Sequence, residues 1–268
     1  ETLLYGDIIG SFEKKFGQFS LNGVIGGSIN DKLVNSLRYD SKTASLKYAN
    51  VFNVANIIMD GSAYIDQQID AHRQLQSLFA TAQVGYKDIF FLDLTARNDW
   101  SSTLAFTPNE KKGFFYPSVG GAWVMSKMFR LPEFISFGKL RAVWSKVGND
   151  IPLYITNPVS HVGAGGEIEY ADSAPFENMK PEMTTSVELG TEWRFLNDRI
   201  SFSGTYYKTN TRNQFFKLPA KSGDKYAYRY VNAGDIQNIG WEVSVSALPV
   251  VGKDFEWKSS LNYSTNKN

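Results

Sequence analysis

The sequence predicts an all-β fold, an antiparallel transmembrane β-barrel wall of about ten consecutive strands. Three observations predict it. Short turns and long polar connections alternate along the chain, the segments between them alternate apolar and polar side chains, and most of these segments are about ten residues or longer. Short turns at one end and long loops at the other are typical of outer-membrane barrels. About ten residues at a tilt is also the length that a strand needs to cross the hydrocarbon core.

The turn pattern predicts which end of each strand faces outward. Short turns are expected at Lys14–Gly17, Lys87–Asp88, Asn197–Asp198 and Gly252–Asp254, and long connections over roughly residues 30–74, 98–113, 148–182 and 211–235. Because the long loops of such barrels lie outside the cell, the pattern puts one set of residues near the exterior: Asp99, Gly148, Thr211 and Gly234. The other set is expected near the periplasm: Lys87, Asn197 and Lys253.

The strands are expected, in chain order, at residues 5–14, 18–29, 75–87, 89–98, 114–125, 137–147, 184–196, 199–211, 237–248 and 255–266. Successive side chains of a strand point to opposite faces, so alternation is the test for each. The first two pass it by compatible alternation only. The third has a clear apolar face: Leu78, Ala80, Ala82, Val84 and Tyr86. The fourth sets Phe90, Leu92, Leu94 and Ala96 against Asp93, Thr95 and Arg97.

The later strands show the same pattern more strongly. Residues 186–196 set Val187, Leu189, Thr191, Trp193 and Phe195 against Ser186, Glu188, Gly190, Glu192 and Arg194. The next example sets Ile239, Trp241, Val243, Val245 and Ala247 against Glu242, Ser244 and Ser246, and the last sets Phe255, Trp257, Leu261 and Tyr263 against Glu256, Lys258, Ser260, Asn262 and Ser264. Ser126–Ser136 connects the fifth and sixth expected strands and is the longest turn expected at the periplasmic end. We expect a short helical segment there that includes Met128, Phe129 and Leu131.

A large antiparallel sandwich or a soluble barrel is the alternative to a membrane barrel. Charged side chains in mid-strand, such as Glu188 and Glu242, favour the membrane barrel because a wet lumen supplies the water or partners that they need. Trp193, Trp241 and Trp257 lie on apolar faces, where a membrane barrel uses tryptophan as an interfacial anchor. Burial of these three against a second sheet would instead indicate the sandwich.

Composition excludes several other classes of protein. The 28 basic and 27 acidic residues leave a net charge of +1, whereas nucleic-acid binding usually requires a basic excess. No run of apolar residues is long enough for a transmembrane helix. Without cysteine, and with only His72 and His161, we expect no metal site and no cofactor. Because the chain starts at Glu1 and stops near the end of a strand, we also expect an internal fragment of a longer protein.

Catalysis has little support in the sequence. Glu188 and Glu192 are a candidate carboxylate pair, but on one strand their Cα atoms would lie about 13 Å apart, farther than glycosidase carboxyl groups stand from each other. We therefore expect no enzyme. Asp172 and Glu177, in a glycine-rich connection, are a candidate oxygen site for a cation, without the spacing of a known calcium loop.

Five short motifs follow one another in a fixed order. They are Arg97-Asn98-Asp99-Trp100-Ser101-Ser102, Tyr116-Pro117-Ser118 with Ala122-Trp123, Lys139-Leu140-Arg141 with Gly148-Asn149, Pro181-Glu182 with Glu188-Leu189-Gly190, and Asn232-Ala233-Gly234 with Asn238-Ile239-Gly240-Trp241-Glu242. In this order they resemble the C-terminal half of the SusC/RagA-like TonB-linked outer-membrane proteins of Bacteroidetes, over roughly residues 75–268. Trp100 stands where that family often has glycine.

The resemblance implies a TonB-dependent outer-membrane importer of glycans, oligosaccharides or peptides. It implies a barrel of about 22 strands, of which residues 1–268 would form part, with the plug domain, the TonB box and the remaining strands lying outside this chain. The implied partners are a SusD-like surface lipoprotein, TonB, outer-membrane lipid and the glycan or peptide substrate, in the outer membrane of a Gram-negative bacterium. A passive porin-type barrel and a soluble all-β carbohydrate-binding module remain as alternatives.

Two groups of site residues are expected. The first consists of charged residues that would face the lumen, mostly in structural roles: Asp93, Arg97, Glu188, Glu192, Arg194 and Glu242. Arg97 is expected to pair with a carboxylate such as Asp93. The second consists of loop aromatic residues that suit sugar stacking or contact with a lid protein, or that instead pack the loops on each other: Trp100, Phe106, Tyr154, Tyr170, Phe176, Tyr226, Tyr228 and Tyr230.

Overall fold

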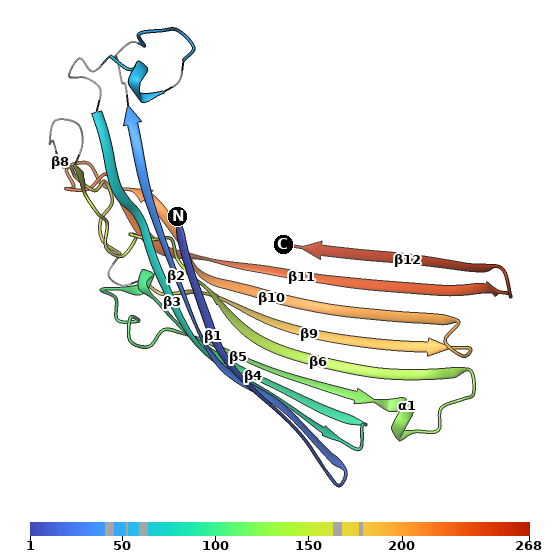
Figure 1. Cartoon of the computed structure of the whole chain (residues 1–268). Coiled ribbons are helices and arrows are strands. Elements are labelled where there is room, and N and C mark those ends of the chain that lie inside the picture. Colours follow the sequence, from blue (N-terminus) through green and yellow to red (C-terminus); the bar gives the residue numbers. More distant parts are fainter. Residues whose placement is uncertain (41–45, 52, 59–63, 163–167, 177–178) are drawn as a thin grey trace.

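A computed structural model describes residues 1–40, 46–51, 53–58, 64–162, 168–176 and 179–268. Ten long strands form one antiparallel sheet in the order β1-β2-β3-β4-β5-β6-β9-β10-β11-β12 (Figure 1). The strands are β1 Thr2–Phe16, β2 Phe19–Asp40, β3 Tyr64–Tyr86, β4 Phe90–Ser101, β5 Phe114–Val124, β6 Ile135–Asn149, β9 Glu182–Phe195, β10 Ile200–Pro219, β11 Tyr228–Val251 and β12 Glu256–Lys267. Each long strand pairs with its nearest long neighbour in the sequence, as the all-β prediction requires.

The remaining elements of the described residues are short. Two two-residue strands, β7 His161–Val162 and β8 Ile168–Glu169, form a second small sheet in the connection between β6 and β9. The helical segments are η1 Val54–Asn56, η2 Ser102–Leu104 and α1 Met125–Met128. No helix in the described part of the chain is long and apolar enough to cross a membrane. The helix expected near residue 128 exists, but it ends before Phe129 and Leu131.

Short turns lie together at one edge of the sheet and long connections at the other (Figure 1). Lys87 and Asp88, between β3 and β4, both have positive φ angles, 53° and 55°. Two such residues make a type I′ turn, whose twist matches that of the flanking strands. Gly17 supplies the positive φ of the β1–β2 turn. The predicted alternation of turns and loops is confirmed.

Several strands are longer than the sequence predicted. The expected loop over residues 211–235 is wrong, because β10 and β11 stay paired up to Pro219 and Tyr228. The connection expected over 30–74 is also shorter, because β2 runs to Asp40 and β3 starts at Tyr64. Beyond the apolar zone, the hairpin of β10 and β11 packs Phe215 and Tyr230 against buried loop residues, while Phe216 and Leu218 stay exposed. Alternation, which marked the strands, therefore disappears there while the backbone ladder continues.

The register divides the side chains of the sheet into two faces. One row crosses all ten strands on the face that we call the inner face, and seven of its ten members have polar side chains: Glu13, Asn22, Gln83, Asp93, Gly120, Val143, Glu188, Tyr207, Gly240 and Asn266. The adjacent row lies on the opposite, outer face: Lys14, Leu21, Val84, Leu92, Gly121, Ala142, Leu189, Tyr206, Trp241 and Thr265. Alternating faces of this kind are typical of a wall between water and lipid.

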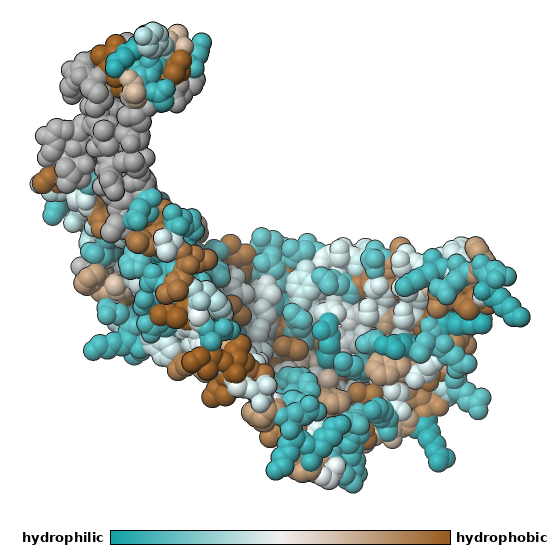
Figure 2. Space-filling view, viewed as in Figure 1, coloured by the Kyte–Doolittle hydropathy of each residue, from teal (hydrophilic) through white to brown (hydrophobic). Residues whose placement is uncertain are grey.

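Large apolar side chains of the outer face are exposed instead of being covered by a second sheet. Leu189 is 51% exposed, Trp241 54% and Trp257 53%, and Trp193 is half-buried. In Figure 2 exposed apolar residues, in brown, gather over the N-terminal strands. The arrangement of the described residues therefore contradicts the sandwich alternative, because these tryptophans have no sheet to pack against.

Candidate functional site

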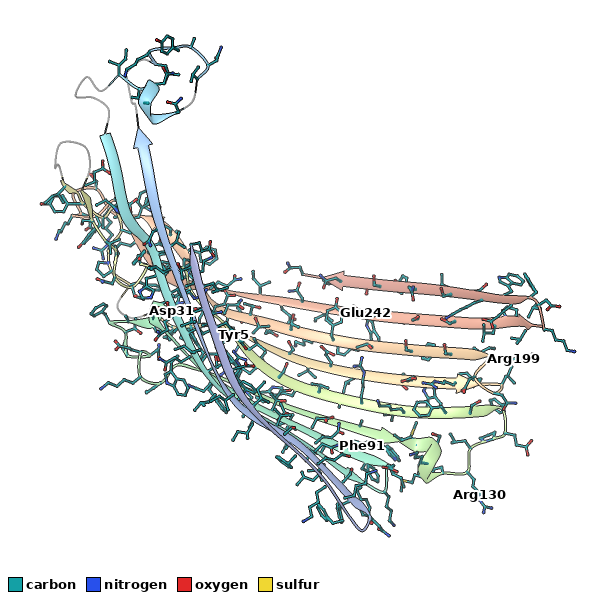
Figure 3. The ribbon with its side chains drawn as sticks, in the orientation of Figure 1. Tyr5, Asp31, Phe91, Arg130, Arg199 and Glu242 are labelled. Carbon is teal, nitrogen blue, oxygen red and sulfur yellow. The ribbon has the colours of Figure 1, made fainter. Side chains whose placement is uncertain are left out.

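The six charged residues expected to face the lumen all lie on the inner face. Asp93 and Arg97 come from β4, Glu188, Glu192 and Arg194 from β9, and Glu242 from β11. Figure 3 labels Glu242 on β11, and Phe91, which shares the inner face, on β4. The structure thus gathers these residues on one surface of the wall, spread over several strands.

Arg97 does not bond the carboxylate that the sequence suggested. Its Nε donates to Asp99 Oδ1 at 2.7 Å and its Nη2 to Ser77 Oγ at 2.9 Å, whereas Asp93 accepts from Gln83 Nε2 at 2.7 Å. Residues 93 and 97 are four apart on one strand, or about 13 Å. Asp99 is the next inner-face residue after Arg97. Arg97 therefore pairs with an inner-face carboxylate, as expected, but Asp93 was the wrong example.

The inner-face carboxylates of β9 do not form a paired site. Glu192 Oε1 accepts from Arg194 Nη2 at 2.9 Å, and Glu188 lies four residues away on the same face. Within the described ranges no group of three or more acidic or histidine side chains is arranged to hold a metal ion. What the inner face offers chemically is a mostly polar, mixed-charge surface.

The long loops are packed on a hydrophobic cluster of their own, which we call the loop core. Its buried members come from the connections that follow β4 and β6, together with the start of β5: Leu104, Phe114, Ile151, Ile155, Phe176 and Met179. Tyr116, Phe215 and Tyr230 pack against it from β5, β10 and β11. The extension of β10 and β11 beyond the predicted strands is what brings Phe215 and Tyr230 to this cluster.

Asp150, directly after β6, ties the loop core to the sheet. Its carboxylate accepts hydrogen bonds from the Arg73 guanidinium of β3, from Ser101 Oγ of β4 at 2.8 Å and from Thr103 Oγ1 of η2. The backbone N–H of Ile151 donates to the same carboxylate at 2.8 Å. Sequence reasoning noted Gly148-Asn149 but missed Asp150. A lone carboxylate after a strand gives no pattern, because its three side-chain partners are 47 to 77 residues away.

The predicted contact aromatics separate into three groups and one residue, Trp100, that belongs to none of them. Phe176 and Tyr230 belong to the loop-core packing, with ring centroids 6.3 Å apart, and Tyr154 is partly buried. Tyr226 and Tyr228 carry lysines over their rings, Lys225 at 5.3 Å and Lys217 at 4.2 Å from the centroids.

Phe106 and Tyr170 form the exposed group, with 73% and 80% of their surfaces accessible. Trp100 differs from all the others. It lies on the outer face of β4, and its Nε1 donates to the carbonyl of Lys111 at 3.0 Å.

Ion pairs stabilise the loop end of the β10–β11 hairpin and the neighbouring connection between β6 and β9. Hydrogen bonds from Ser173 and from Lys217, whose Nζ lies 3.1 Å from Oδ2, lower the pKa of Asp172 below its ordinary value. A bond from Arg229 likewise lowers the pKa of Asp224. Of the candidate cation pair, Asp172 has its carboxylate paired with Lys217. The other member, Glu177, lies outside the described residues.

An open antiparallel sheet with a polar inner face, an exposed apolar outer face and packed loops at one edge defines the wall of a membrane-spanning β-barrel. A family model for the TonB dependent receptor-like β-barrel matches residues 4–268. The chain belongs to this family, the TonB-dependent receptors, and forms part of the barrel.

Known relatives agree with this assignment. The chain is similar to TonB-dependent receptor P3 of Formosa agariphila, 28% identical over 96% of this chain and 26% of that protein. It is also similar to TonB-dependent receptor SusC of Bacteroides thetaiotaomicron, 29% identical over 77% of this chain and 23% of that protein. The chain thus spans about a quarter of the length of these relatives.

The fold is shared with a solved structure as well. A structure described as the RagAB peptide transporter matches 98% of this chain and 29% of its own, with a TM-score of 0.79 and 16% identity. The predicted fold class and the predicted family are both confirmed.

Proposed function

We propose that this chain is part of the wall of an outer-membrane importer that takes up oligosaccharides, larger glycans or peptides with energy supplied through TonB. The mostly polar inner face of the ten-stranded sheet, in a chain of the TonB-dependent receptor family, carries the proposal. A water-filled lumen admits hydrated solutes, and mixed charge with hydroxyl and amide groups suits polar chains better than lipophilic ones. The similarity to SusC, and to a structure described as a peptide transporter, supports this substrate class.

The test uses the full-length receptor in its own outer membrane. Uptake of fluorescent oligosaccharides and of fluorescent peptides is measured in the parent strain, in a strain without the receptor and in a strain without TonB. We expect uptake of one of these substrates to disappear in both deletions. Uptake that persists without TonB but requires the receptor indicates the passive porin alternative, and uptake unaffected by receptor deletion rejects the import role for these substrates.

We further assign the outer loops to contact with a SusD-like surface lipoprotein that captures the substrate. Phe106 and Tyr170 are the aromatic residues that support this, because they remain exposed above an otherwise packed loop core. Exposed aromatic side chains at the centre of a contact surface commonly dominate binding.

Co-purification of the lipoprotein with the tagged receptor tests this assignment. The double substitution Phe106→Ser and Tyr170→Ser is expected to lower the co-purified amount at least tenfold, because each truncated anchor costs about 1–2 kcal/mol or more. Phe255→Ser, at the turn edge and 64% exposed, is the matched control. Equal loss in the control, or no loss in the double variant, would reject the role of these two residues.

A further inference from the structure

Hydroxyl side chains form one row across the inner face, from β3 to β10. We call this set the hydroxyl row, and each member pairs with the next in the register: Thr81, Thr95, Ser118, Ser145, Ser186 and Thr209. Adjacent strands of a sheet lie about 4.8 Å apart, so the row extends over about 24 Å. It crosses the middle of the ten-stranded sheet and includes neither edge strand.

The inner-face rows on either side of the hydroxyl row have a different composition. On the same strands, the row nearer the short turns contains two carboxylates, Asp93 and Glu188, and no lysine or arginine. The row nearer the long loops contains Arg97, whose guanidinium is paired with Asp99 at 2.7 Å, and Tyr116. Neither adjoining row therefore offers an unpaired cation, and the uncharged hydroxyl groups are confined to one level of the wall, directly below the loop core.

None of the six hydroxyl groups has a hydrogen-bond partner among the described residues. Other hydroxyl groups of the inner face do have one. Thr184 and Thr211 bond each other at 2.8 Å, and Thr205 accepts from Arg141 at 2.9 Å. Two residues of the hydroxyl row are exposed and four are half-buried. Their donors and acceptors are therefore free for a ligand in the lumen.

Two hollows of the inner face meet along this row. One has a volume of about 520 Å³, and its lining includes Thr81 and Thr95. The other has a volume of about 330 Å³, and its lining includes Thr95, Ser118 and Ser145. Thr95 lines both hollows, so they adjoin there, and the part of the hydroxyl row from β3 to β6 lies in a recess of the wall.

We propose that the hydroxyl row binds an uncharged oligosaccharide that lies across the strands, which deepens the proposed import function and rests on it. A serine or threonine hydroxyl donates one hydrogen bond and accepts others, as a sugar hydroxyl does, so the two kinds of group can bond each other in either direction. The spacing of the strands is close to the length of one sugar unit, so successive units meet successive strands.

The same chemistry disfavours two other ligands. A peptide offers only one N–H and one C=O on each residue's backbone, which leaves most of a dense array of hydroxyl groups without a partner. An acidic sugar finds the carboxylates of Asp93 and Glu188 in the adjoining row and no unpaired cation there, and like charges repel. The hydroxyl row therefore selects a neutral saccharide.

The test measures binding of the purified full-length receptor to an array of neutral oligosaccharides of differing linkage, uronic-acid oligosaccharides and short peptides. We expect a neutral oligosaccharide to bind most tightly. The double variant Ser118→Ala with Ser145→Ala removes the hydroxyls of two register partners. One hydrogen bond contributes about fivefold in affinity, so this variant should bind the same oligosaccharide about 25-fold more weakly.

The matched control is Ser203→Ala with Ser244→Ala, which removes two register partners on the inner face nearer the short turns and should leave binding unchanged. Both double variants should keep the unfolding temperature of the unaltered receptor, because the hydroxyls that they remove have no partner in the described part of the chain.

Four results would overturn the proposal. They are tighter binding of peptides or acidic sugars than of any neutral oligosaccharide, no binding of a neutral oligosaccharide, equal affinity of the Ser118/Ser145 variant and the control, and a weakened affinity that comes with a lowered unfolding temperature. The measurement requires neither TonB nor an energised membrane. Oligosaccharide binding without TonB-dependent uptake would therefore reject the import proposal and leave the hydroxyl row as a saccharide site.

Discussion

Substitution of Asp150 by alanine should release the outer loops from the barrel wall while the strands stay folded. Asp150 holds Arg73, Ser101 and Thr103, which belong to three different elements, and its side chain is only 17% exposed. A hydrogen bond to a charged group contributes about 1.5–3 kcal/mol. Because Arg73 is 41% exposed and regains water, the total local loss should lie near the value for one such bond, about 3 kcal/mol.

Hydrogen exchange of the full-length receptor measures this loss directly. A local destabilisation of about 3 kcal/mol accelerates exchange more than 100-fold in the affected segment. We expect this acceleration over residues 101–107 and 151–156 and unchanged protection in β9 and β10. Asp150→Asn keeps one acceptor oxygen but loses the charge, so its effect should be intermediate. Asp254→Ala, at the exposed turn before β12, is the control. Unchanged exchange at residues 101–107 in Asp150→Ala would refute the view that this carboxylate anchors the loops.

Three further predictions concern the loop core, the acid response and the two faces of the wall. Leu104→Ala removes a fully buried side chain and should destabilise the loop core by about 2–5 kcal/mol. The measurement is hydrogen exchange at residues 151–156, which should become faster. Phe106→Ala is the control and should leave hydrogen exchange there unchanged. The pKa of Asp172 is lowered from 3.8, so its contribution is fully present above pH 3.8 and is lost as the pH falls through the lower folded pKa. Pepsin cleavage within residues 168–176, normalised to an unfolded substrate, should therefore rise at the acid end of that window in the unaltered protein, and Asp172→Asn should abolish this pH dependence. The chain contains no cysteine, so a single introduced cysteine can be labelled selectively. Glu188→Cys should react with a membrane-impermeant maleimide added to outer-membrane vesicles, whereas the adjacent Leu189→Cys should not. Equal labelling of both would contradict the assignment of inner and outer faces.

The alternation of β9 illustrates how the sequence predicted the wall. Val187, Leu189 and Trp193 lie on the outer face and Glu188, Glu192 and Arg194 on the inner face, as their period of two requires. The same rule predicted the inner-face placement of Asp93 and Glu242. It failed at the loop end of the β10–β11 hairpin. There Phe215 and Tyr230 pack against loop residues that are distant in the sequence, so the apolar residues do not follow a period of two.

Individual partners were less predictable than faces. Arg97 was expected to meet Asp93, yet it bonds Asp99 and Ser77. Which of several same-face carboxylates an arginine reaches depends on distances of a few ångströms, and those are set by the strand rise and by the neighbouring strand. Of the loop aromatics, nothing in the sequence distinguished Tyr230, which packs in the loop core, from Tyr170, which stays exposed.

The sequence by itself determined the class of fold, the two faces of the wall and the edge at which the long loops lie, because each depends on local periodicity and turn chemistry. Tertiary structure alone decided the lengths of the hairpins, the Asp150 anchor and the loop core. Each of these depends on contacts between residues far apart in the chain, and such contacts leave no periodic trace. The short turns and long loops that first indicated a barrel therefore mark the two edges of the wall. The contacts between the loops determine how the loops pack at the long-loop edge.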